Sequence, residues 1–347
     1  MRKKNRTAQR LARLADLLRG KASMLIVLQD NPDPDAIAAA VALRELANRL
    51  AGVACSIAHG GTIGRAENRE LVQYLGLNLR RLPDLHPGDF DLVALVDTQP
   101  GTGNNSLPPG FAPHLVVDHH PCRRATRSVP VTDVRSKYGA TSTILWEYLV
   151  EAGTTPDVPL ATALLYGIRS DTQDLGREAA QADIRAYDAL FPLANKRMLG
   201  QIQRGQVPDA YYQMLLRGLT SALLCASAVT SGLGDVDNPD MIGEVADLLL
   251  RHERAQWSLC YGFHEGKALV SVRTIDASRR ADDVARRVAS RIGTSGGHAT
   301  MAGAQVPLRT DSPRRRARLE RMIRDRFLAA LGIAGLPATH LVKAAAG

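Results

Sequence analysis

The chain has few aromatic residues, few cysteines and no long hydrophobic run. Aromatic residues make up 4% of its 347 residues, so few rings are available to stack on the bases of a long single strand. The four cysteines, Cys55, Cys122, Cys225 and Cys260, lack paired spacing, which argues against a disulfide framework or a zinc site. No apolar stretch approaches the roughly 18 to 20 residues that span a bilayer. We therefore expect a cytoplasmic protein with no membrane partner.

The composition is that of a globular protein with an excess of cations. Hydrophobic residues make up 45% and charged residues 23% of the chain, and the net charge is +9. This excess favours polyanionic partners such as nucleotides, oligonucleotides or polyphosphate. Part of it lies in an arginine-rich run over residues 314–326. The run is explained either by a solvated helix face or by an electrostatic funnel for substrate.

Alternating strand and helix patterns predict the fold of the first half. Short apolar runs predict strands at 24–28, 53–58, 92–96 and 115–117, and helical spacing of apolar residues predicts helices at 7–19, 36–50, 140–152 and 160–168. This alternation indicates a mainly parallel sheet covered on both faces. In such sheets ligands collect at the carboxyl ends of the strands.

A second pattern follows, and the fold class is α/β with two domains. We expect a catalytic domain over 1–195, a helical connector over 196–220 and a smaller α/β domain over 221–335, with a cleft between the domains. The second domain should contain strands at 226–230, 258–263 and 269–273 and helices at 281–292 and 312–331. The Ala-rich tail, 336–347, is expected to be flexible.

Acidic and imidazole side chains stand where the predicted elements of the first domain end. The triplet Asp118-His119-His120 follows one strand, Asp97 follows another, and Asp33 and Asp35 follow the first. Asp171 is expected just after a helix. Each acid taken alone has a simpler explanation, such as a helix N-cap by Asp35 or a loop cap by Asp97. Their convergence on one edge of the sheet instead predicts a metal site.

The donor set indicates which metal and which chemistry. Carboxylates together with imidazoles suit Mn²⁺, with Mg²⁺, Fe²⁺ or Co²⁺ as alternatives. A shared carboxylate can bridge two ions about 3.5 to 4 Å apart, which activate water and clamp a phosphoryl group. The sequence thus predicts a binuclear site for phosphoester hydrolysis.

The second domain carries a glycine-histidine segment. In Ser295–Gly303 the adjacent Gly296 and Gly297 let backbone amides approach an anion, and His298 can donate to phosphate. Arg273, at the end of a predicted strand, is a second candidate phosphate donor. A surface ion pair is the alternative explanation for Arg273.

These segments resemble the ordered motifs of the DHH phosphoesterase superfamily. The resemblance is carried by Pro32–Ala36, Val96-Asp97, Val117–Pro121 and Ser170–Thr172, and the Gly296–Gly303 stretch resembles the signature of the DHH-associated C-terminal domain. It covers nearly the whole chain and is specific for the superfamily rather than for a substrate. Members of similar size and layout include the NrnA-type oligoribonuclease, 3′-phosphoadenosine-5′-phosphate phosphatases and stand-alone phosphodiesterases of cyclic or linear dinucleotides.

The resemblance implies a role for each site residue. Asp33 would bind the first metal and Asp35 the second, Asp97 would bridge both, and His119 and Asp171 would complete the set of ligands around the second metal. Asp118 would support the histidines or the metals, and His120 would face the phosphate. Arg273, Gly296, Gly297 and His298 would hold the substrate.

One position departs from the NrnA-like pattern. Such members usually carry a histidine four residues before the first aspartate, where this chain has Gln29. A neutral amide binds Mn²⁺ more weakly than imidazole, so either the first site is weaker or another group replaces the histidine. His59, at the end of the second predicted strand, is our candidate for that group. The polar segment after His59 is interpreted equally well as a substrate contact or as an ordinary loop.

The expected function is hydrolysis of short oligonucleotides, dinucleotides or nucleoside bisphosphates by metal-activated water. The alternatives are an exopolyphosphatase or pyrophosphatase, and a nucleotide-binding module with weakened catalysis. A homodimer is left open by the sequence.

Overall fold

The computed structural model describes residues 6–308 and 310–342, and the chain divides into two compact units. The first unit comprises Met1–Gln206 and the second Val207–Gly347. Of the predicted connector, α7 (Lys196–Ile202) belongs to the first unit and α8 (Asp209–Ser221) to the second. Among the helices of the described residues, none has both the length and the apolar composition needed to cross a membrane.

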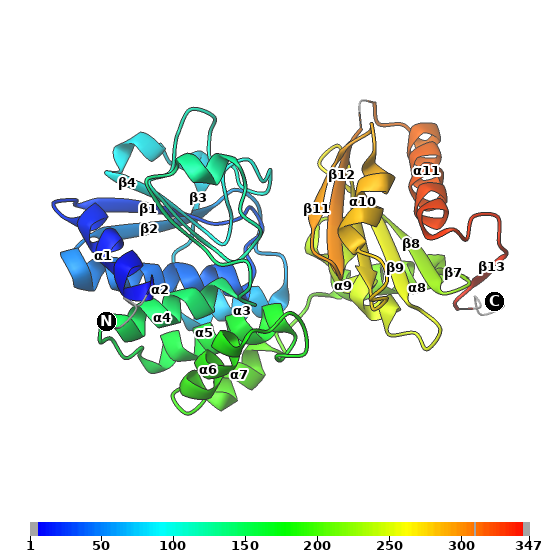
Figure 1. Cartoon of the computed structure of the whole chain (residues 1–347). Coiled ribbons are helices and arrows are strands. Elements are labelled where there is room, and N and C mark those ends of the chain that lie inside the picture. Colours follow the sequence, from blue (N-terminus) through cyan, green and yellow to red (C-terminus); the bar gives the residue numbers. More distant parts are fainter. Residues whose placement is uncertain (1–5, 309, 343–347) are drawn as a thin grey trace. The chain divides into compact units, whose positions relative to one another are not determined.

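A six-stranded, wholly parallel sheet organises the first unit (Figure 1). Its strand order is β3-β2-β1-β4-β5-β6. The strands are β1 Ser23–Val27, β2 Ala54–His59, β3 Arg80–Arg81, β4 Leu92–Val96, β5 Leu115–Asp118 and β6 Val131–Val134. The helices are α1 Arg6–Leu18, α2 Pro34–Ala51, α3 Ala66–Tyr74, α4 Thr141–Glu151, α5 Val158–Thr172, α6 Gln181–Leu190 and α7. The strand order reverses between β1 and β4, and such a reversal opens a crevice at the carboxyl ends of the two strands.

The two faces of this sheet are covered differently. Side chains alternate along β1, so Met24 and Ile26 belong to the core shared with α2, α4 and α5. These helices lie along one side of the sheet (Figure 1). Leu25 and Val27 face a second apolar cluster whose described members include no α-helical residue. That face is covered by loops and by short 3-10 turns, for example at Leu82. The predicted cover on both faces is present, and α-helices supply only one side of it.

The second unit has its own seven-stranded sheet, in the order β11-β12-β10-β9-β8-β7-β13. Only β8 and β9 pair in parallel, and the other neighbours are antiparallel. The strands are β7 Leu223–Cys225, β8 Ala228–Asp235, β9 Trp257–His264, β10 Lys267–Thr274, β11 Thr294–Gly297, β12 Met301–Pro307 and β13 Ala338–His340. The helices are α8, α9 Asp240–Leu250, α10 Ala281–Ala289 and α11 Pro313–Leu331.

Helices cover both faces of the second sheet. Residues of α10 and α11, such as Val284 and Ile323, belong to one buried cluster. Residues of α8 and α9, such as Met214 and Val245, belong to another. This unit is therefore a three-layer α/β/α structure.

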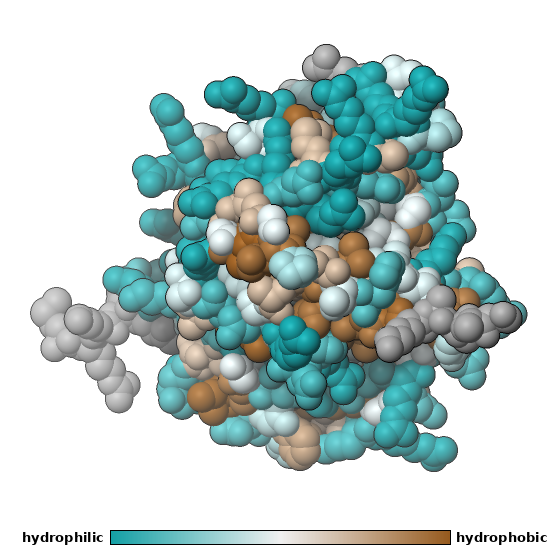
Figure 2. Space-filling view, turned by 90° about the vertical axis from the view of Figure 1, so that its right-hand side faces the viewer, coloured by the Kyte–Doolittle hydropathy of each residue, from teal (hydrophilic) through white to brown (hydrophobic). Residues whose placement is uncertain are grey.

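The arginine-rich run lies on α11, as predicted, with its apolar stripe buried against the second unit. Arg316 pairs with Asp235 and Asp311 at 2.7 and 2.5 Å, and Arg326 donates to backbone carbonyls at the C-terminal end of α10. Hydrophilic side chains cover most of the face seen in Figure 2, around a smaller apolar area. Part of the positive charge in this run is therefore already paired within the fold.

Part of the C-terminal segment belongs to the second sheet. Flexibility of residues 336–347 stays a prediction for this Ala-rich end. In the structure β13, Ala338–His340, pairs with β7, and Leu341 packs against the α8–α9 cluster. The strand covers the edge that β7 would otherwise present. Residues 343–347 of the predicted tail lie outside the described residues.

Candidate metal centre

The predicted acidic residues of the first unit meet at the crevice between β1 and β4. Asp33 and Asp35 follow β1, Asp97 follows β4, and Asp118 ends the neighbouring strand β5. Asp171 also reaches this edge, but it lies in the last turn of α5 rather than after the helix as predicted. The helix runs on to Thr172, whose hydroxyl donates to the carbonyl of Ile168.

Asp33 and Asp35 use their carboxylates in different ways. Asp33 is the N-cap of α2 and accepts the Ala36 amide at 2.9 Å. Asp35 is fully buried, and its two oxygens accept the backbone amides of Thr141 and Ser142, each at 2.7 Å. The simpler explanation for Asp35, capping its own helix, is therefore wrong, because Asp33 caps α2. Asp35 holds the amino end of α4, where a negative charge is favoured.

His119 stands at the centre of two groups of possible metal ligands. Ligand atoms of Asp97, His119 and His120 lie within 4.8 Å of one another, and so do those of Asp35, His119 and Asp171. His119 Nε2 lies 3.1 Å from Asp171 Oδ2 and 3.6 Å from Asp97 Oδ1. His119 Nδ1 lies 3.2 Å from the Tyr138 carbonyl oxygen. That carbonyl can only accept, so Nδ1 carries a proton, and Nε2 is turned toward the carboxylates.

Asp97 shows that this cluster fits a cation. It is 1% exposed and has a φ of 58°, a left-handed conformation that aspartate tolerates better than most residues. Its Oδ1 accepts the Thr141 hydroxyl at 2.8 Å. Within the described residues its buried Oδ2 has no hydrogen-bond partner. A buried carboxylate oxygen of this kind is costly without a proton or a metal ion.

The electrostatics of the cluster favour the same conclusion. Burial, together with the charge of Asp171, raises the pKa of Asp33 to about 6 and that of Asp35 to about 7. Burial and the charges of Asp33 and Asp35 raise the pKa of Asp97 well above its usual range. Burial alone would lower the pKa of His119, but Asp171 and the neighbouring carboxylates raise it well above its ordinary value. These carboxylates therefore hold protons more readily than usual, and a divalent cation would replace those protons when it binds.

Hydrogen bonds that run from Gln99 through Asp118 orient His120. Its Nδ1 lies 2.7 Å from Asp118 Oδ1, which also accepts the His120 amide at 3.1 Å. The other oxygen of Asp118 accepts Gln99 Nε2 at 2.5 Å. Burial acts to raise the pKa of Asp118, but the hydrogen bonds and charge of His120, with the charge of His119, hold it below the ordinary value. His120 thus donates its Nδ1–H to the Asp118 carboxylate, and this fixes the orientation of the ring.

Gln29 faces Asp33 with the donor end of its amide. Gln29 Nε2 lies 2.9 Å from Asp33 Oδ2, so both oxygens of Asp33 accept hydrogen bonds from the protein. His59 ends β2, next to β1 as predicted, with Nδ1 3.3 Å from the Asp30 carbonyl oxygen. Neither Asp33 nor His59 belongs to the ligand groups found among the described residues. A role for His59 in metal binding stays a prediction.

The four predicted substrate residues of the second unit lie around one hairpin. β11 and β12 pair Gly296 with Gly303 and Gly297 with Ala302, and Arg273 on β10 is opposite Met301. Gly297 has a φ of 144°, and a Cβ there would lie 2.4 Å from the Ala302 Cα, so this position requires glycine. A Cβ on Gly296 would meet no atom within 4 Å.

The turn of this hairpin is held by its own backbone. The His298 amide donates to the Met301 carbonyl at 2.6 Å, and the carbonyls of His298 and Ala299 accept the first amides of α10. Arg273 Nε lies 2.7 Å from Asp247 Oδ1, so the ion pair expected as the alternative for Arg273 is present. An ion pair with a half-exposed acid does not prevent a second contact to phosphate.

Sequence reasoning missed three residues that shape the centre. Gln99 is fully buried, accepts the Thr126 hydroxyl and the Arg123 amide, and donates to Asp118. Thr141 and the carbonyl of Tyr138 position Asp97 and His119. For Thr141, the sequence signal is the Thr-Ser pair at the start of a predicted helix. Such a pair is typical of a helix cap and does not indicate a contact with acids of other segments.

Two family models match the chain. The DHH family, N-terminal domain, matches residues 23–168, and the DHHA1 domain matches residues 224–325. Each match falls within one of the two structural units.

Known proteins resemble the chain in sequence and in fold. An uncharacterized protein of Methanocaldococcus jannaschii is 31% identical over 322 residues, which are 90% of this chain and 65% of that protein. A probable manganese-dependent inorganic pyrophosphatase of Lactobacillus helveticus is 30% identical over 167 residues, 48% of this chain and 53% of that protein. The chain thus spans between about half and two thirds of these relatives. The solved structure of an exopolyphosphatase-related protein from Bacteroides fragilis has a TM-score of 0.70 at 12% identity, covering 92% of this chain and 97% of that one, a likeness of fold alone.

Proposed function

Because the chain belongs to the DHH phosphoesterase superfamily, with a DHH domain followed by a DHHA1 domain, we propose that it is a metal-dependent phosphoesterase. Its substrates would be short oligonucleotides, dinucleotides or nucleoside bisphosphates. The observation that carries the proposal is the buried cluster around His119, with its raised carboxylate pKa values and the unsatisfied Oδ2 of Asp97.

The proposed metal ligands are Asp33, Asp35, Asp97, His119 and Asp171. They would hold two divalent cations, Mn²⁺ first and Mg²⁺ or Co²⁺ as alternatives, with Asp97 shared between them. When bound, such ions activate water and neutralise charge on phosphoryl oxygens. The Tyr138 carbonyl keeps the His119 ring turned so that Nε2 is available as a ligand.

His120 is the proposed catalytic partner on the substrate side. Asp118 accepts the Nδ1–H of His120. When the ring also carries a proton on Nε2, that proton would be donated to a phosphate oxygen or passed to the leaving group. Gln99 keeps Asp118 in place through its second oxygen. In the second unit, Arg273, Gly296, Gly297 and His298 are the proposed substrate-binding residues. The guanidinium and the imidazole would supply phosphate contacts.

Two other functions remain as alternatives with specific support. An exopolyphosphatase or pyrophosphatase is supported by the names of the Bacteroides fragilis and Lactobacillus helveticus proteins and by the net charge of +9. A nucleotide-binding module with weakened catalysis is supported by Gln29. Its amide donates a hydrogen bond to Asp33, whereas a metal-binding side chain at this position would place a second ligand beside Asp33.

A substrate panel with Mn²⁺ tests the proposal. It contains pApA, short RNA, a nucleoside bisphosphate, cyclic di-AMP, pyrophosphate and polyphosphate, with Asp97→Asn as the inactive control. We expect turnover of the linear nucleotides. Phosphate release from polyphosphate or pyrophosphate alone would replace the main proposal by the first alternative, and tight nucleotide binding without turnover would replace it by the second.

A further inference from the structure

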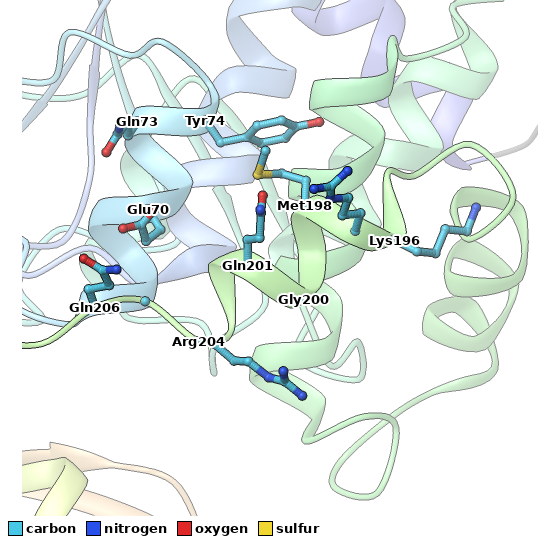
Figure 3. Close-up of a pocket in the computed structure, with 11 residues that line it drawn as sticks. Glu70, Gln73, Tyr74, Lys196, Met198, Gly200, Gln201, Arg204 and Gln206 are labelled. Atoms are coloured by element: carbon cyan, nitrogen blue, oxygen red, sulfur yellow. The ribbon is translucent and has the colours of Figure 1, made fainter.

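The first unit contains a hollow of about 850 Å³ between α3 and α7 (Figure 3). It is lined by residues from the second half of α3, from α7 and from the segment over 204–206. In the close-up, Gln201 of α7 reaches toward Tyr74 of α3, while Glu70 and Gln206 border the other side (Figure 3). None of the proposed metal ligands lines this hollow, so it is a separate feature of the unit.

Its lining combines positive charge with amides. Arg197 and Arg204 contribute guanidinium groups that form no ion pair within residues 6–308 and 310–342. Gln73, Gln201 and Gln206 each offer an amide donor and an amide acceptor. Such a lining suits an anion that also carries hydrogen-bonding groups.

Helix α3 connects the hollow to the metal centre. In its first turn, Asn68 Nδ2 donates to the Pro32 carbonyl at 3.0 Å, one residue before Asp33. Gly205, in the wall of the hollow, packs on the first residue of the same helix, because a Cβ there would lie 2.7 Å from the Ala66 carbonyl carbon. The first turn of α3 therefore contacts both the segment just before Asp33 and the wall of the hollow.

We propose that this hollow binds a segment of a single-stranded oligonucleotide beyond the nucleotide that is cleaved. The inference rests on the proposed function and narrows its substrate class toward chains longer than a dinucleotide. Base edges present both donors and acceptors, which matches the amides and the carboxylate of Glu70. Polyphosphate offers acceptors only, so Glu70 and the amide oxygens would disfavour it.

Gly200 allows the hollow to be filled with little disturbance. It lies in α7 and lines the hollow, and a Cβ there would meet no atom within 4 Å. Gly200→Leu places a side chain in the space, and Gly200→Ala is the matched control because both changes favour the helix. We expect Gly200→Leu to raise KM for a five-nucleotide RNA about tenfold, with KM for pApA unchanged within twofold. Gly200→Ala should leave both values unchanged.

A charge test uses binding rather than turnover. We expect Arg197→Ala with Arg204→Ala to weaken binding of a fluorescent five-nucleotide RNA about ten- to thirtyfold in EDTA. Arg185→Ala, with its exposed arginine on α6 outside the hollow, should have little effect. Equal losses for pApA and the longer RNA, or no loss for either, would overturn the subsite. So would a loss confined to polyphosphate. Length-dependent binding without hydrolysis in any metal would instead overturn the proposed function and leave the subsite standing.

Discussion

The edge of the first sheet and the glycine-histidine hairpin of the second unit are built on opposite principles. At the edge, Asp35, Asp97 and Asp118 are at most 1% exposed, and packing holds their like charges together. In the hairpin, Gly296 and Gly297 are exposed, and backbone hydrogen bonds hold the turn. The difference indicates that changes at the edge alter stability and metal affinity together, whereas hairpin changes that leave the backbone undisturbed alter substrate binding alone.

Asp97→Asn is expected to have the largest effect. Asparagine tolerates the positive φ of this position, so the fold should be retained. Losing a carboxylate that we propose is shared by two metal ions should lower kcat/KM by about two to three orders of magnitude. The metal-free variant should nevertheless melt at a higher temperature at pH 8, because a buried charge next to Asp33 and Asp35 is removed. Asp89→Asn, an exposed acid, is the control. A lower melting temperature for Asp97→Asn would contradict the account of mutual repulsion.

The pH dependence of stability should change sign when metal is added. The pKa of Asp33 is raised to about 6 and that of Asp35 to about 7, so between about pH 4 and 7 the folded chain binds more protons than the unfolded chain. Without metal, the free energy of unfolding should therefore rise by a few kcal/mol between pH 8 and pH 5. His119, whose pKa is also raised, acts in the same direction.

Saturating Mn²⁺ should reverse this slope, because the cation requires deprotonated carboxylates. Urea unfolding in EDTA and in Mn²⁺ at pH 5.5, 7 and 8.5 measures both slopes. Parallel slopes would show that protons and metal do not compete for this cluster.

Variants of Gln99 test whether the Asp118–His120 pair can be disturbed without a change in metal binding. Gln99→Glu would set a carboxylate against Asp118 Oδ2, and Gln99→Met would remove the hydrogen bonds while keeping the volume. Both should lower kcat about ten- to a hundredfold with little change in metal content, as for other partners that orient a catalytic group. Gln99→Glu should in addition shift the pH profile of kcat, since it changes the charge beside the Asp118–His120 pair. Gln203→Glu, on an exposed residue, is the control. Unchanged pH profiles for both Gln99 variants would leave Gln99 a purely structural role.

Strands that coincide with a continuous apolar run could be predicted from the sequence. The strand Leu92–Val96 has the predicted bounds because it is buried on both faces and its pattern is continuous. The two-residue strand β3 carries too few residues for a pattern, and it was not predicted. Gln99 and Thr141 were missed for another reason: their partners lie 19 and 44 residues away, and only the folded chain joins them.

Gln29→His should change metal binding without changing the fold. The Gln29 amide donates to Asp33 Oδ2, whereas an imidazole nitrogen at this position could serve as a ligand beside it. We expect Mn²⁺ to bind the weaker site about tenfold more tightly, with a metal-to-protein ratio closer to two after dialysis. Metal content by mass spectrometry and titration calorimetry measure both quantities. His59→Ala is the companion variant, and a loss of metal in it would show that His59 already replaces the missing imidazole.

His298→Ala is expected to have the smallest effect. It tests the hairpin of the second unit, as Asp97→Asn tests the edge of the first sheet. Because the turn is held by backbone hydrogen bonds, removing the imidazole should leave the melting temperature unchanged. The loss of one hydrogen bond to phosphate should raise KM about fivefold to tenfold.

Two glycine variants separate backbone geometry from ligand contact. Gly297→Ala should destabilise the second unit because of its φ of 144° and the close Ala302 Cα, whereas Gly296→Ala should not. A fall in melting temperature for His298→Ala equal to that for Gly297→Ala would mean that the imidazole supports the hairpin, and the contrast between the two regions would fail.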